Sequence, residues 1–154
     1  MINRRLLGLL TLSVFIVSGC GGDGLPKRYK VSGKVTYKGA PVAKGTISFY
    51  PVKSSGENPG GFGNITDGYY TLTTFKDGDG ALPGEYEVSI DSREVDLKEA
   101  EKRAGGGAMR QDDVAKANAK AKLLIPKKYI ETSTSGLKAT VKTSSNTFDF
   151  ELQD

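Results

Sequence analysis

The chain has 154 residues, with 22 Lys and Arg against 18 Asp and Glu, one cysteine, and no histidine or tryptophan. The lack of histidine removes the commonest general base, the commonest metal ligand and the usual activator of a catalytic serine or cysteine. A histidine-ligated zinc site and an internal disulfide are therefore excluded. No cluster of basic residues alternates with aromatic residues, so we expect no nucleic-acid partner.

The N-terminal segment has the features of an export signal. Two arginines near the start precede an apolar run at 6–17, which is shorter than the roughly 20 residues that cross a membrane. Two small residues and the single cysteine follow, in the order Val17-Ser18-Gly19-Cys20. This motif resembles the lipobox of bacterial lipoproteins. The alternatives are an ordinary secreted protein whose cysteine lies near the cut by chance, and an uncleaved N-terminal anchor.

The resemblance implies that the signal peptide, residues 1–19, is removed and that Cys20 becomes the new N-terminus. Its sulfur would carry a diacylglycerol, and its amine a further acyl chain such as palmitate. Two or three acyl chains suffice for stable anchoring, since each buried CH₂ contributes about 0.8 kcal/mol. We therefore expect a membrane-anchored lipoprotein of the cell envelope, on the periplasmic or outer-membrane side.

After the cysteine, a glycine-rich stretch at 20–28 predicts a flexible tether. From Tyr29 to Tyr37, apolar and polar residues alternate, which indicates a strand with one solvent-exposed face. Similar β-type patterns, separated by turn residues, recur at 46–50, 69–75, 85–91, 137–142 and 147–152. Together they predict one all-β domain at 29–154, an antiparallel β-sandwich.

Residues 92–122 interrupt the strand pattern. The segment is rich in Lys, Glu and Ala and has three consecutive glycines near its middle. Its flanks at 95–103 and 112–122 have helical propensity, but their apolar stripes are thin and mostly alanine. We expect an exposed, mobile insertion that is partly helical at best.

Several fragments occur in an order typical of one family. They are VSGKVTYKGAPV at 31–42, GTISF at 45–49, DGYYTL at 67–72 and PGEYEV at 83–88. This order resembles the carboxypeptidase regulatory-like domains, which implies a seven-stranded antiparallel β-sandwich of transthyretin-like or Ig-like form. TFKDGDG at 74–80 and IPKKY at 125–129 extend the resemblance to small lipoproteins of planctomycete-type bacteria. The family has no common catalytic residues, so the resemblance implies a fold and a location but no reaction.

A glycine-rich loop contributes the candidate metal ligands Asp77 and Asp79, whose carboxylates suit Ca²⁺. A full EF-hand needs a glutamate at the twelfth position of the loop, where this chain has Val88. We favour a turn that uses Asp and Gly for their backbone freedom, and we expect no metal and no cofactor.

Tyr69 and Tyr70 are the candidate binding residues, because neighbouring aromatic side chains could form a sugar- or peptide-binding face. Aromatic residues on strands more often pack in the core or in cross-strand pairs, and we favour that interpretation. A serine paired with Lys53 or Lys138 is chemically feasible as a nucleophile, but we expect no enzyme.

The sequence thus predicts a lipid-anchored β-sandwich with a structural or protein-interaction role and no catalysis. The alternative is an envelope carbohydrate- or calcium-binding module. The expected partners are the membrane, through the N-terminal lipid, and an envelope protein or polysaccharide.

Overall fold

The computed structural model describes residues 24–53, 56 and 58–154. The predicted signal peptide, Cys20 and the first residues of the predicted tether lie outside this part of the chain. No helix within the described residues is long and apolar enough to cross a membrane.

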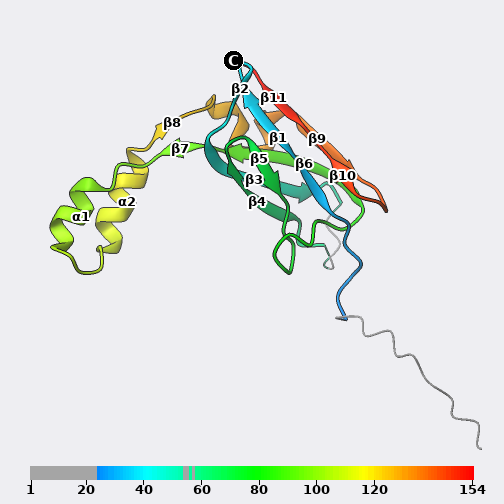
Figure 1. Cartoon of the computed structure of the whole chain (residues 1–154), viewed down its shortest axis with the longest axis horizontal. Helices are drawn as coiled ribbons and strands as arrows, with labels where there is room; N and C mark the ends of the chain where they lie inside the picture. Colours follow the sequence, from blue (N-terminus) through cyan, green and yellow to red (C-terminus); the bar gives the residue numbers. More distant parts are fainter. Residues whose placement is uncertain (1–23, 54–55, 57) are drawn as a thin grey trace, which may run out of the picture.

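One curled sheet forms the body of the domain (Figure 1). Along the sheet the strands follow the order β10-β1-β5-β4-β3-β6-β9, and β2 and β11 also pair with β1. Their bounds are β1 (Val31–Tyr37), β2 (Ala40–Pro41), β3 (Lys44–Pro51), β4 (Gly61–Thr66), β5 (Tyr69–Thr71), β6 (Gly84–Asp91), β9 (Leu137–Val141), β10 (Asn146–Thr147) and β11 (Phe150–Leu152). Most neighbours are antiparallel, so the all-β prediction is confirmed.

The expectation of antiparallel pairing throughout is wrong at β1, which runs parallel to both β10 and β11. The predicted last strand at 147–152 is divided into β10 and β11 at Phe148 and Asp149, and both parts keep the same register against β1. The N–H of Phe148 donates to the carbonyl of Ser32 at 3.0 Å, and Asp149 Oδ1 then accepts the N–H of Lys34 at 2.8 Å. A carboxylate therefore replaces a backbone carbonyl in the ladder between the two strands.

Five aromatic rings fill the inside of the curl. Phe49, on β3, has its ring centroid 5.8 Å from that of Tyr86, 6.0 Å from Phe148, 6.3 Å from Phe150 and 6.4 Å from Tyr70. Tilted and edge-on contacts of this kind stabilise beyond the area they bury. Phe49 is thus the central residue of a core that joins β3, β5, β6 and the C-terminal strands.

The hairpin turn between β4 and β5 has the backbone that its sequence predicts. Asp67 and Gly68 both have positive φ, 50° and 83°, and Thr66 pairs with Tyr69 across this turn between β4 and β5. Positive φ at both central residues suits the right-handed twist of the strands, and Asp-Gly adopts it at low cost. The predicted strand at 69–75 is shorter than expected, since β5 ends at Thr71.

The interruption at 92–122 forms a β-ribbon and two helices that extend away from the sheet (Figure 1). These elements are β7 (Arg93–Glu94), α1 (Lys98–Ala104), α2 (Gln111–Ala119) and β8 (Lys122–Leu123). The helices lie close to the two flanks for which helical propensity was noted. The chain then returns to the core through the 3-10 helix η1 (Lys127–Tyr129) and α3 (Thr132–Ser135), where Ile125 and Tyr129 are buried.

Candidate functional site

The described N-terminal segment is fastened to the sheet domain at one loop. Tyr29 and Ala81 form a two-way backbone bridge, with N–O distances of 2.9 and 3.0 Å. Arg28 Nε lies 2.9 Å from Asp79 Oδ2, and both side chains are only 11% exposed. The Arg28 guanidinium also lies 5.4 Å from the ring centroid of Phe75. We call this arrangement the tether clamp, because it fixes the chain just where the predicted tether reaches the domain.

Asp79 organises its own loop as well as the clamp. Its carboxylate accepts the backbone N–H groups of Thr74 at 2.8 Å, Lys76 at 2.9 Å and Phe75 at 3.2 Å. Together with the Arg28 guanidinium, these donors occupy the oxygens that a cation would need. Asp77, the other calcium candidate, is exposed. Among the described residues, no three Asp, Glu, His or Cys side chains come together in a way that could hold a metal ion.

The donors around Asp79 also set its pKa. Burial of the carboxyl acts to raise the pKa, but the N–H groups of Thr74, Lys76 and Phe75 and the bond from Arg28 outweigh burial and lower it. A carboxyl whose folded pKa is depressed stabilises the fold above its unfolded pKa of about 3.9. That contribution is lost as the pH falls through the lower, folded pKa.

We predict that Asp79→Asn lowers the free energy of unfolding by about 2 kcal/mol at neutral pH, because charge-assisted bonds are lost. The difference from wild type should shrink as the pH falls below about 3.9. Urea unfolding monitored by circular dichroism between pH 2 and pH 7 measures both effects. Asp77→Asn, two residues away on an exposed side chain, is the control and should change little. A difference for Asp79→Asn that stays constant down to pH 2 would contradict this account.

The two tyrosines predicted as binding candidates point to opposite faces of β5. Tyr69 is 59% exposed on the outer face, whereas Tyr70 is only 4% exposed and packs against Phe49 and Phe150. The Tyr70 hydroxyl donates to the carbonyl of Phe148 at 2.8 Å. Burial, together with the nearby charge of Asp149, raises the pKa of Tyr70. Tyr70 is therefore a core residue, and only Tyr69 is available to a ligand.

A shallow groove of about 690 Å³ lies beside Tyr69 on the outer face of the sheet. Hydroxyl and amide side chains from β1, β4 and β5 line it, among them Ser32, Asn64, Thr66 and Thr71. The Lys34 ammonium lies 5.3 Å from the centroid of the Tyr69 ring. A cation at this distance from an aromatic ring is attracted to it, so Lys34 helps to hold the ring in place at the groove.

A second groove, of about 380 Å³, lies further along β3 and β4 on the same face. Its lining includes Tyr50 and Phe62, which are 51% and 52% exposed. Ser48 pairs with Phe62 across the two strands, so their side chains share the outer face. The sequence analysis did not single out Tyr50 or Phe62; the alternation along each strand was the signal that could have placed them outward.

We call the line of side chains that connects the two grooves the outer stripe. It consists of Tyr69, Thr66, Asn64, Phe62, Ser48 and Tyr50. Within the described part of the chain, none of these six side chains makes an intramolecular hydrogen bond, so their polar groups face solvent. Such a surface can offer aromatic rings and hydrogen-bonding groups to a bound molecule without first breaking internal bonds.

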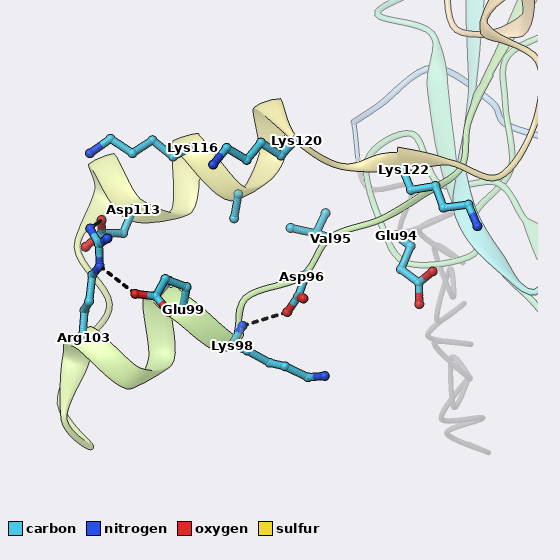
Figure 2. A pocket seen from close by; sticks show the side chains of 12 residues that line it. Glu94, Val95, Asp96, Lys98, Glu99, Arg103, Asp113, Lys116, Lys120 and Lys122 are labelled. Carbon is cyan, nitrogen blue, oxygen red and sulfur yellow. Dashed lines mark hydrogen bonds and ion pairs between the residues drawn. The ribbon is translucent and has the colours of Figure 1, made fainter.

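The largest pocket described, about 720 Å³, lies between α1 and α2 (Figure 2). Its lining is mostly charged, and three of the charged residues form ion pairs with one another. Arg103 Nη1 lies 3.0 Å from Asp113 Oδ1, and Arg103 Nε lies 3.3 Å from Glu99 Oε1. Asp113 is buried, so this ion pair holds the two helices together. We interpret the pocket as the space between two short helices with few apolar contacts.

Comparisons of this chain with protein-family models, with curated proteins and with solved structures find no match.

Proposed function

We propose that this chain is a non-catalytic, lipid-anchored protein of the cell envelope, whose β domain serves as a binding module. The observation that carries the proposal is the order of a basic start, an apolar run and Val17-Ser18-Gly19-Cys20. This order is the pattern that lipoprotein processing requires, and it contains the only cysteine in the chain. The acyl chains on Cys20 would keep the domain at a membrane surface.

The proposed fold is the seven-stranded transthyretin-like sandwich of the carboxypeptidase regulatory-like domains. The curl of the sheet supports it, because the strands enclose one aromatic core. The tether clamp supports the anchoring role. A mechanical force on the tether would act on the domain through Arg28 and Asp79, at the edge of the core, and not through the end of a strand.

Two surfaces of the sheet are candidates for binding a partner. β9 pairs only with β6, so its other edge is a candidate for strand addition by a protein. That strand carries an outward lysine, Lys138, a residue type that discourages edge pairing. The outer stripe lies on a face of the sheet and not at its edge, and its solvent-facing polar groups and exposed rings favour it as the binding surface.

We predict that Cys20→Ala moves the full-length protein from the detergent phase to the aqueous phase when it is expressed in bacteria that process lipoproteins. The mass of the N-terminal peptide should change in parallel, from an acylated form that begins at Cys20 to an unacylated one. Gly22→Ala, two residues beyond the processing point, is the control and should remain in the detergent phase. An unmodified thiol with an intact leader in the wild-type protein would refute lipid anchoring.

A further inference from the structure

We propose that the outer stripe binds a neutral polysaccharide chain, which lies along β4 and stacks sugar rings on Tyr69 and Phe62. The inference rests on the proposed function as a binding module and specifies the chemical class of its ligand. It also assigns a position to the ligand, from the groove beside Tyr69 to the groove beside Tyr50.

The first argument is the distribution of exposed aromatic rings. Among the described residues, the exposed aromatic side chains are Tyr50, Phe62, Tyr69 and Phe75, and all but Phe75 belong to the outer stripe. The three rings lie on one solvent-exposed face of the sheet, and exposed aromatic side chains gathered on one face indicate a binding surface. A sugar ring carries C–H bonds on its faces, and these suit the face of an aromatic ring.

The second argument is the polar chemistry between the rings. Asn64 and Thr66 lie on β4 between Phe62 and Tyr69, and their side chains have no internal hydrogen-bond partner in the described structure. Amide and hydroxyl groups both donate and accept, which matches the hydroxyl groups at the rim of a sugar ring. The four residue steps from Phe62 to Thr66 span about 13 Å, so the stripe is long enough for several linked rings.

The third argument is charge. None of the six stripe residues is charged, but charged residues lie opposite both ends of the stripe: Lys44 pairs with Thr66, and Glu87 pairs with Tyr50. Glu87 and Lys138 are direct cross-strand neighbours. Lys34 and Asp149 line the groove beside Tyr69, so the charges around the stripe are of both signs. Because neither sign of charge dominates, the stripe has no field that would attract an acidic polymer, and this favours an uncharged ligand.

A protein partner fits the stripe less well. Stable protein interfaces bury about 800 Å² on each side and have an apolar centre from which water is excluded. On the stripe, Asn64 and Thr66 separate Tyr69 from Phe62, so the rings form no continuous apolar centre. Two shallow grooves joined along one strand suit a narrow extended chain.

The test is affinity electrophoresis of the full-length protein in detergent micelles, through native gels that contain one dissolved polysaccharide each. The neutral probes are hydroxyethylcellulose, dextran and galactomannan, and the acidic probe is alginate. We expect retardation by at least one neutral probe. Tyr69→Ser and Phe62→Ser should each weaken the association constant by about tenfold or more, equivalent to 1.4 kcal/mol.

Two further variants serve as controls for the binding assay. Tyr69→Phe retains the ring and should bind within about twofold of wild type, which separates stacking from misfolding. Phe75→Ser makes the same kind of change at an exposed ring outside the stripe and should leave binding unchanged. Thermal melts of every variant establish that the fold is retained.

Three outcomes would overturn the proposal: no retardation by any neutral probe, retardation that Tyr69→Ser and Phe62→Ser leave unchanged, or retardation by alginate alone. The assay does not depend on acylation, because the micelle keeps the chain soluble either way. A negative result would therefore leave the anchoring experiment on Cys20 unaffected, and a failure of anchoring would leave this assay interpretable.

Discussion

Phe49→Ala should lower the free energy of unfolding by about 4 kcal/mol, close to the upper end for a buried aromatic residue. Phe49 is only 1% exposed, and its ring contacts the rings of Tyr70, Tyr86, Phe148 and Phe150. Those residues come from separate parts of the chain, so the backbone cannot close the cavity by moving one element. The loss therefore includes both the transfer free energy of the ring and the cost of the space left behind.

Urea unfolding monitored by tyrosine fluorescence and circular dichroism measures this loss. Phe62→Ala is the matched control, because Phe62 is the same residue type on the neighbouring strand but points outward and is 52% exposed. It should cost less than about 1 kcal/mol. Equal losses for the two variants would mean that Phe49 is not the centre of the core.

Gly33→Ala should lower the free energy of unfolding by about 3 kcal/mol through steric overlap. A Cβ built on Gly33 would lie 1.9 Å from the carbonyl oxygen of Phe148 and 2.6 Å from its carbonyl carbon. Both contacts are with backbone, so no side-chain rotation can relieve them. β1 and the backbone at Phe148 would have to separate, and the hydrogen bond between Tyr70 and Phe148 would be disturbed.

The measurement for Gly33→Ala is again urea unfolding, with Ser32→Ala as the control. Ser32 is the preceding residue on β1, and its exposed side chain makes no hydrogen bond in the described structure. The control should change stability by less than about 0.5 kcal/mol. If Gly33→Ala changed the free energy of unfolding as little as Ser32→Ala, the close approach of β1 to the C-terminal strands would not be required for folding.

Local features of the fold could be predicted from the sequence because they depend on neighbouring residues. Alternation placed Tyr86, Val88 and Ile90 on one buried face of β6. Asp67-Gly68 predicted a tight turn, and the positive φ values of both residues agree with that prediction. The segment at 92–122 has helical propensity, and it forms the helices α1 and α2.

The pairing of β1 with β10 and β11 could not be predicted in the same way. Nothing near Val31 or Asn146 indicates that residues so far apart in the sequence become partners. The sequence predicts one strand at 147–152, because Phe148, Phe150 and Leu152 recur at every second position. At the break between β10 and β11 the Asp149 carboxylate accepts the N–H of Lys34, which is a tertiary contact.

The candidate site was predicted only in part. The pair Tyr69 and Tyr70 was identified as aromatic, but adjacent strand residues point to opposite faces, so the two could not share one surface. Asp79 was identified as a loop carboxylate, but its bond to Arg28 crosses 51 residues. The outer stripe depends on the register between β3 and β4, which fixes which hydroxyl groups and rings become neighbours.

The parallel ladder between the first and last strands has a consequence for biosynthesis. Lys34 and Asp149, which meet in this ladder, are 115 residues apart. Contacts of such long sequence separation form slowly, since the loop between them must close first. A nascent polypeptide leaving the ribosome therefore cannot complete its aromatic core until Phe148 and Phe150 have been synthesised. An exported chain would gain from this delay, because a secretion channel accepts unfolded substrates.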